Sequence, residues 1–128
     1  MKEALAYKLT VTIPGKPVPC PRPRVSKNGT YYPASYMAWQ EMAHVLLRDE
    51  CVKRRGGKMF ERRVGVEVRF FGAHGSADLD NLVKSVLDAA QGAVFVNDRQ
   101  VYRLEAAKFG HVKLGKPYTL VQVWEVLA

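Results

Sequence analysis

The stretch ADLDNLVKSVLDAAQGAVFVNDRQV, residues 77–101, decides how the rest of this chain can be arranged. Its apolar residues recur at spacings of three and four, which is the pattern of one buried face of an α-helix. This face comprises Leu79, Leu82, Val83, Val86, Leu87 and Ala90. Asp80 and Lys84 follow each other at an i+4 interval on a more accessible side of the same helix. Asp78 stands at the start of the helix and Asp98 just past the following loop, so the stretch is predicted to form a site.

Length and composition predict a single globular domain covering residues 1–128, because 48% of the residues are hydrophobic. No apolar run approaches the length of a membrane span, and Met1-Lys2-Glu3 opens no signal-peptide pattern. Cys20 and Cys51 are too few for a disulfide scaffold and are expected to be free thiols. We therefore expect a cytoplasmic protein.

The charge balance points to a polyanionic partner. Twenty Lys and Arg residues against twelve Asp and Glu residues give a formal net charge of +8. Such an excess on a small domain indicates nucleic acid first and an anionic membrane surface second.

Periodicity predicts an α+β fold, a two-layer arrangement of helices on one face of a mixed β-sheet. The helices are expected at 35–53, with Ser35 as N-cap, and at 79–90. Trp39 is expected to pack in the core or an interface, and the alternative is a platform on which a base stacks. The expected strands are 5–13, 64–70, 93–96, 100–109 and 118–126, the last two resembling a hairpin.

Two basic segments lie outside these elements. Residues 14–35 hold six of the seven prolines, with Asn28-Gly29 as a turn signal, and are predicted to form a long basic loop. The spacing of prolines and arginines favours a held shape, although a mobile arm with generic charge attraction also fits. Residues 53–58 form a basic turn at a helix end, either solvated or in contact with phosphate.

Clustered carboxylates repel one another unless they share a proton or a cation. Oxygen ligands suit Mg²⁺ or Mn²⁺, whereas zinc prefers His or Cys, and the three histidines here show no ligand spacing. No base lies at a recognisable spacing from a Ser, Cys or His nucleophile. An acidic site on a basic protein suggests metal-assisted attack of water on a phosphodiester, with a lysine to neutralise developing charge.

Each of these residues also fits a structural role. Asp78 could cap the helix, and Asp80 could complement the helix dipole in its first turn. Lys84 could pair on the surface with Asp80 or with Asp88, which is otherwise predicted to be a solvated helix residue. Asn97-Asp98 is also an ordinary turn dipeptide.

Residues 78–84, DLDNLVK, resemble the D-x-D-N-x-x-K signature of the RusA-type Holliday junction resolvases. Residues 86–92, VLDAAQG, and the run 94–98 that ends in Asn-Asp fit the family pattern in order. The segments 15–17 and 21–24 resemble the family's basic loop, as 36–39 resembles its first helix. Asn97 departs from the acid that some members carry at that position.

The resemblance implies that Asp78, Asp80 and Asp98 are metal-binding catalytic acids and that Lys84 is an essential amine near the scissile phosphate. Family members are homodimers that use Mg²⁺ or Mn²⁺ to nick four-way DNA junctions in pairs, and they often come from phages or prophages. The implied phosphate contacts are Arg22, Arg24, Lys27, Arg54 and Arg55.

The expected protein is therefore a Mg²⁺-dependent endodeoxyribonuclease that resolves Holliday junctions as a homodimer, without a membrane or small-molecule cofactor. A nuclease acting on other branched DNA is the nearest alternative. A non-catalytic nucleic-acid-binding protein is the third, although carboxylates beside a phosphate would bring it no benefit.

Overall fold

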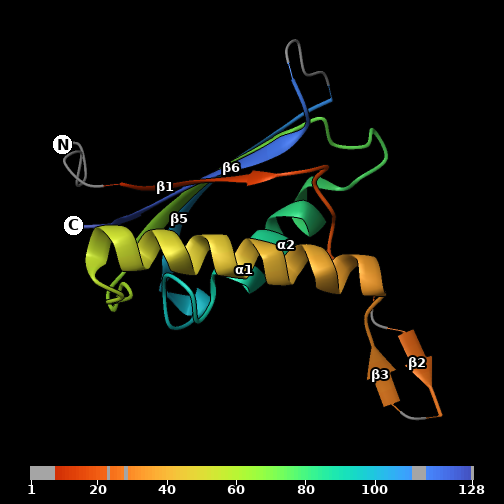
Figure 1. The fold of residues 1–128 in the computed structure, drawn as a ribbon, viewed down its shortest axis with the longest axis horizontal. Coiled ribbons are helices and arrows are strands. Elements are labelled where there is room, and N and C mark those ends of the chain that lie inside the picture. The colour runs from red at the N-terminus through yellow and green to blue at the C-terminus, as the bar shows by residue number, and fades with distance from the viewer. Residues whose placement is uncertain (1–7, 23, 28, 111–114, 128) are drawn as a thin grey trace.

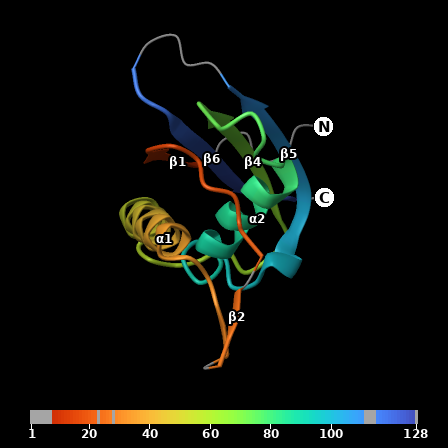
Figure 2. The same cartoon turned by 90° about the vertical axis from the view of Figure 1, so that its right-hand side faces the viewer.

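The computed structural model describes residues 8–22, 24–27, 29–110 and 115–127. Two helices pack on one face of a four-stranded mixed sheet, and the other face carries no helix among these residues (Figures 1 and 2). The elements of this layer pair are β1 (Leu9–Pro14), α1 (Ala34–Arg55), β4 (Val64–Phe71), α2 (Leu79–Ala90), β5 (Val101–Phe109) and β6 (Tyr118–Glu125). The predicted α+β class is confirmed.

The sheet has the order β1-β6-β4-β5. Strand β6 is antiparallel to both β1 and β4, while β5 runs parallel to β4. The prediction that the last two strands form a hairpin is therefore wrong. Strand β4 lies between β5 and β6, because β6 inserts between β1 and β4 and leaves β5 at the edge.

Alternation along the strands explains why one face is covered. In β4 the buried Val64, Val66, Val68 and Phe70 point toward the helices. In β1 the buried Leu9, Val11 and Ile13 alternate with exposed residues. The predicted start of this strand at Leu5 lies outside the described residues.

Helix α1 buries one stripe spaced by three and four residues. The stripe consists of Tyr36, Trp39, Ala43, Leu47 and Cys51. Trp39 is 6% exposed, which confirms its assignment to the core. Ser35 is not the N-cap: Pro33 occupies that position, in an extended conformation that its ring favours, without a side-chain cap. At the other end Gly56 closes the helix at φ +65°.

Helix α2 begins and ends where the periodicity predicts, with Leu82, Val83 and Val86 buried. The run 93–96, expected to be a short strand, is instead a turn in which Ala93, Val94 and Phe95 are buried and Val96 is 56% exposed. The N–H groups of Ala93 and Val94 both donate to the carbonyl oxygen of Ala90, at 2.9 and 3.0 Å, so they continue the end of the helix instead of pairing in the sheet.

The predicted loop at 14–35 contains a small antiparallel hairpin, β2 (Arg24–Ser26) and β3 (Gly29–Tyr31). This hairpin projects away from the sheet and helices beside the N-terminal end of α1 (Figure 1). Asn28 of the predicted turn lies outside the described residues, whereas Gly29 adopts φ +111°. None of the described helices is long and apolar enough to cross a bilayer.

Candidate active site

The first turn of α2 opens into a cavity of about 560 Å³. Asp78 occupies the N-cap position, yet its side chain makes no capping hydrogen bond. Asp80 in the first turn is also exposed, and its Oδ1 accepts from the Asn81 N–H at 2.9 Å. Both aspartates line the cavity together with Lys84. The capping role that sequence allows for Asp78 is therefore not the role of its carboxylate here.

The opposite wall of the cavity comes from the basic loop. The Cys20 N–H donates to the Asn81 carbonyl oxygen at 2.9 Å, which fixes the loop against the first turn of α2. Pro19, Pro21 and Arg22 then line the same cavity as the acids. Two segments about 60 residues apart in sequence thus form one site. Of the two interpretations of the basic loop, the geometry around Cys20 supports the held shape and not the mobile arm.

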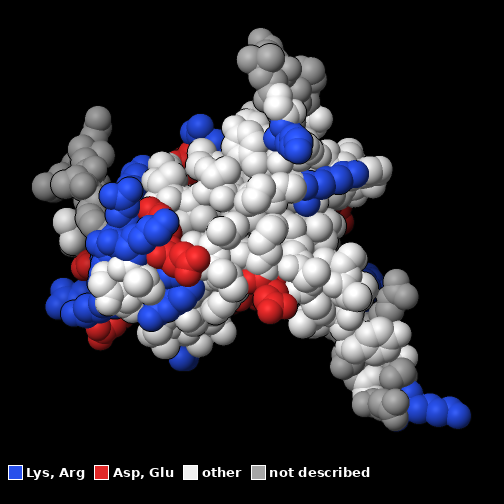
Figure 3. Space-filling model, in the orientation of Figure 1, with Lys and Arg blue, Asp and Glu red and all other residues white. Residues whose placement is uncertain are grey.

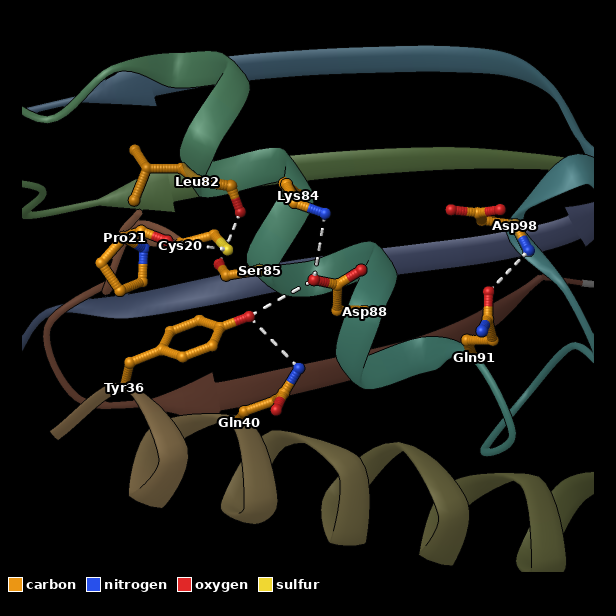
Figure 4. A network of polar contacts seen from close by, with 10 residues as sticks. All are labelled: Cys20, Pro21, Tyr36, Gln40, Leu82, Lys84, Ser85, Asp88, Gln91 and Asp98. Atoms are coloured by element: carbon orange, nitrogen blue, oxygen red, sulfur yellow. Dashed lines mark hydrogen bonds and ion pairs between the residues drawn. The ribbon is translucent and has the colours of Figure 1, made fainter. Parts of the chain in front are cut away.

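Lys84 lies one turn into α2 and forms an ion pair with Asp88, with Nζ 3.5 Å from Oδ2 (Figure 4). The charge of the Asp88 carboxylate raises the pKa of Lys84. The same carboxylate oxygen accepts from the Tyr36 hydroxyl at 3.4 Å, and Gln40 donates to that hydroxyl at 3.2 Å. Burial raises the pKa of Tyr36, which therefore keeps its proton and remains a donor. Asp88 is not the solvated residue predicted from sequence, because it connects Lys84 to α1.

Asp98 begins a single 3₁₀ turn, Asp98–Gln100, whose backbone is held on several sides. Its N–H donates to Gln91 Oε1 at 3.0 Å. Gln100 Oε1 accepts from the Asn97 N–H at 2.9 Å, and its amide group donates to the carbonyl oxygens of Phe60 and Arg62. The backbone is thus tied down while the Asp98 residue is exposed, an arrangement suited to presenting a carboxylate.

Asp98 does not line the cavity that contains Asp78 and Asp80. Among the residues that the structure describes, no three His, Cys, Asp or Glu side chains are close enough together to hold a metal ion. Asp78 and Asp80 supply the oxygen donors that Mg²⁺ prefers, and this cation is commonly bound by one or two carboxylates with the substrate's phosphates completing the shell. The donor chemistry of this pair therefore fits such an ion.

The predicted phosphate-contacting residues fall into two separate groups. Arg22 is exposed at the cavity, the backbone of Arg24 lies in β2, and Lys27 is exposed at the tip of the hairpin. Arg54 and Arg55 lie at the other end of α1, about 30 Å away along a helix of this length. Figure 3 shows basic side chains gathered over that end and another at the hairpin tip.

The arginines at the end of α1 have structural contacts of their own. Arg54 Nε is 3.0 Å from Glu50 Oε2. Arg55 Nε donates to the Lys58 carbonyl oxygen at 2.8 Å, and its guanidinium carbon lies 3.8 Å from the ring centre of Phe60. The structure therefore does not bring these two arginines to the acidic site.

Lys108 is a site neighbour that sequence reasoning missed. From the C-terminal end of β5, its Nζ donates to the Ala77 carbonyl oxygen at 2.7 Å and approaches that of Gly75 at 3.4 Å. It thus supports the backbone that immediately precedes Asp78. No local signal marks it, because its relation to that turn depends on β5 lying parallel to β4.

A family model described as endodeoxyribonuclease RusA matches residues 14–123, which include the basic loop, α2 and the Asp98 turn. The chain belongs to the RusA endodeoxyribonuclease family. Membership supports a DNA endonuclease of the kind that acts on branched junctions and resolves Holliday junctions in recombination. Among curated proteins, none matches the chain well enough to count as a relative.

Proposed function

We propose that this protein is a Mg²⁺-dependent, structure-selective endonuclease that resolves Holliday junctions by paired phosphodiester hydrolysis, with Mn²⁺ able to replace Mg²⁺. One observation carries the proposal: a single cavity joins Asp78, Asp80 and Lys84 of α2 to Arg22 of the basic loop. Hydrolysis of a phosphodiester calls for carboxylates that can bind a cation and for cationic side chains that face the phosphate, and this cavity has two of each.

Asp78 and Asp80 would hold the cation at the first turn of α2, and Asp98, on the 3₁₀ turn that follows α2, would be the third carboxylate. A bound divalent cation supplies Lewis-acid chemistry toward a phosphoryl oxygen. Lys84, which Asp88 keeps protonated, neutralises charge that develops on the phosphate. Asp88 and Tyr36 hold the Lys84 ammonium on the cavity side of α2.

The two basic groups would contact different parts of the junction. Arg22, Arg24 and Lys27 position the strand that enters the site. Arg54 and Arg55 contact a second arm beyond the far end of α1. Since these contacts are to the phosphate backbone of the DNA, they contribute affinity that depends on salt but no preference for sequence.

Paired nicks require two sites related by a two-fold axis, so we propose a homodimer of single domains that each span residues 1–128. Its partner is a four-way DNA junction, with no membrane and no small-molecule cofactor. As a bacterial or phage-encoded nuclease, the protein would work in the cytoplasm.

The decisive experiment is cleavage of a labelled four-way junction with Mg²⁺, beside a linear duplex and a flap. We expect symmetric nicks in the junction alone, and loss of cutting in Asp80→Asn. Asp49→Asn is the matched control, because Asp49 is an exposed aspartate on α1 remote from the cavity lining. Equal cutting of the flap would favour a broader branched-DNA nuclease. Binding without metal-dependent cutting would return the acids to a structural role.

A further inference from the structure

A second cavity, of about 540 Å³, lies beside the 3₁₀ turn that carries Asp98. Three exposed arginines line it, and we call it the arginine cavity. Arg62 and Arg63 come from the segment that leads into β4, and Arg99 comes from the turn itself. None of the three is among the phosphate contacts predicted from the sequence, because only folding brings the two segments together.

Neighbouring acids do not neutralise the charge of the arginine cavity. Among the described residues, none of its three arginines forms an ion pair with a carboxylate. Glu61 also lines the cavity, but its Oε1 is 3.9 Å from Lys58 Nζ. Glu125 adjoins Arg62 and Arg63 in a neighbouring cavity without forming an ion pair with them. Cationic groups gathered in this way attract an anionic ligand.

One side chain holds the two walls of the arginine cavity together. The amide group of Gln100 donates to the carbonyl oxygens of Phe60 and Arg62, at 2.9 and 2.8 Å. Its Oε1 accepts from the Val96 N–H at 2.8 Å. The backbone that carries Arg62 is therefore fixed against the turn that carries Arg99. A ligand that contacts both walls finds them already in place, which lowers the entropic cost of binding.

Tyr102 adds an aromatic ring to the lining of this cavity. The residue is 63% exposed, and the guanidinium carbon of Arg63 lies 5.0 Å from the centre of its ring. On the 3₁₀ turn, Asn97 orients Arg99, because its Oδ1 accepts from Arg99 Nε at 3.2 Å. Proteins bind single strands of nucleic acid with this combination, in which bases stack on exposed rings and cationic groups follow the phosphates. The ring therefore favours a nucleic acid over a small inorganic anion.

We propose that the arginine cavity binds the phosphate backbone of a DNA strand through Arg62, Arg63 and Arg99, with one base stacked on Tyr102. The binding stands on the charge, the fixed walls and the exposed ring. That the bound strand is the one cut at Asp80 rests on the proposed function.

The position of the arginine cavity suits a strand that leaves the active site. Arg99 follows Asp98 directly, so their Cα atoms are about 3.8 Å apart. A strand cut at the carboxylates would pass directly into the cavity. On its other side, Phe60 precedes the cavity-lining segment, and the guanidinium carbon of Arg55 lies 3.8 Å from the centre of the Phe60 ring. The cavity thus adjoins both the Asp98 turn and the basic end of α1.

The test is binding of a short, fluorescently labelled single strand of oligothymidylate to the full chain, measured by anisotropy without a divalent cation. Each of Arg62→Gln, Arg63→Gln and Arg99→Gln should reduce the slope of log K against log salt by about 0.7, because one phosphate contact is lost. Arg69→Gln is the matched control, since Arg69 Nη2 is 2.7 Å from Glu67 Oε2 on the helix-free face of the sheet. It should leave the slope unchanged. An equal effect of all four substitutions would show generic charge attraction and overturn the proposal.

The aromatic ring is tested separately. Tyr102→Leu should weaken binding roughly tenfold and leave the salt slope unchanged, because a stacked base is lost and no phosphate contact is lost. Tyr102→Phe keeps the ring and should bind as the unmodified protein does. Equal affinities of Tyr102→Leu and Tyr102→Phe would contradict the stacked base. Inorganic phosphate that displaced the oligonucleotide as effectively as unlabelled oligothymidylate does would reduce the cavity to a simple anion site.

A second measurement locates the bound strand. In isotope-labelled protein the oligonucleotide should shift the NMR signals of the amide groups of Arg63, Arg99 and Gln100. Shifts confined to the basic loop and α1, with these three unmoved, would overturn the proposal. Neither measurement involves a cation or cleavage, so either can succeed in a protein that does not cut DNA. Failure of the arginine cavity and failure of the nuclease proposal are therefore distinguishable.

Discussion

Gly65→Ala is expected to destabilise the fold through a single contact. Gly65 lies opposite Trp124 on the helix-free face of the sheet, and the indole covers it. A Cβ at this position would lie 2.4 Å from Trp124 Cε2 and 2.5 Å from Cζ2, whereas ordinary contacts begin at 3.4 Å. The ring must therefore move by about 1 Å.

The indole has little freedom to make that movement. Trp124 is 4% exposed, and Lys8 Nζ lies 4.5 Å from its ring centre. Overpacking a filled site of this kind costs about 1–3 kcal/mol. For a chain of this size each kcal/mol lowers the melting temperature by roughly 3–6 °C.

Urea denaturation of four variants would test this reasoning: Gly65→Ala, Gly75→Ala, Trp124→Phe, and Gly65→Ala combined with Trp124→Phe. Gly75→Ala is the matched control, because nothing lies within 4 Å of its Cβ position and its φ is not positive. It should change the free energy of unfolding by no more than about 0.5 kcal/mol. In a Trp124→Phe background Gly65→Ala should cost less, since a smaller ring leaves room. Equal stability of Gly65→Ala and Gly75→Ala would refute the contact as its cause.

Three further outcomes are expected. Thr119→Val should raise the free energy of unfolding by about 1 kcal/mol in urea denaturation, because the buried Thr119 hydroxyl has no hydrogen-bond partner among the described residues. A loss of stability would show that the hydroxyl has a partner. Asp88→Asn should lower the pKa of Lys84, because the charge of Asp88 raises that pKa. In an NMR titration the Lys84 ammonium should then lose its proton at a lower pH, whereas Asp49→Asn should leave the titration of Lys84 unchanged. Arg22→Ala with Arg24→Ala should weaken junction binding and reduce the slope of log K against log salt by about 2, and an unaltered slope would remove the loop from the DNA surface.

Much of the core could be predicted from the sequence because periodicity reports burial directly. Val64 to Phe70 alternate because one face of β4 lies under the helices, and Leu82, Val83 and Val86 repeat at helical spacing because α2 packs there. The position of β5 could not be predicted in this way. Its pattern gives strand and exposure, but the choice between β4 and β6 as neighbour depends on the whole sheet.

Local signals failed where tertiary contacts decided the outcome. The apolar run at 93–96 has the composition of a strand, yet Gly92 at φ +80° turns the chain into the core. In the candidate site, the proximity of Asp78, Asp80 and Lys84 could be predicted from their spacing along one helix. Cys20, Tyr36 and Lys108 come from three other segments, and only folding brings them to α2.

The hydrogen bond from Cys20 to Asn81 joins the arginine-bearing loop to the turn that carries Asp80. On the proposed function, this hydrogen bond would couple the binding of two ligands: if phosphate on the loop favours one arrangement of the turn, cation affinity would rise by the same factor as DNA affinity rises with the cation. Under that proposal, hydrolysis would require the cation and the DNA to be bound together. An enzyme with this property selects its substrate by whether both ligands are bound as well as by the shape of the DNA. It would be inactive with only a cation or only a polyanion bound.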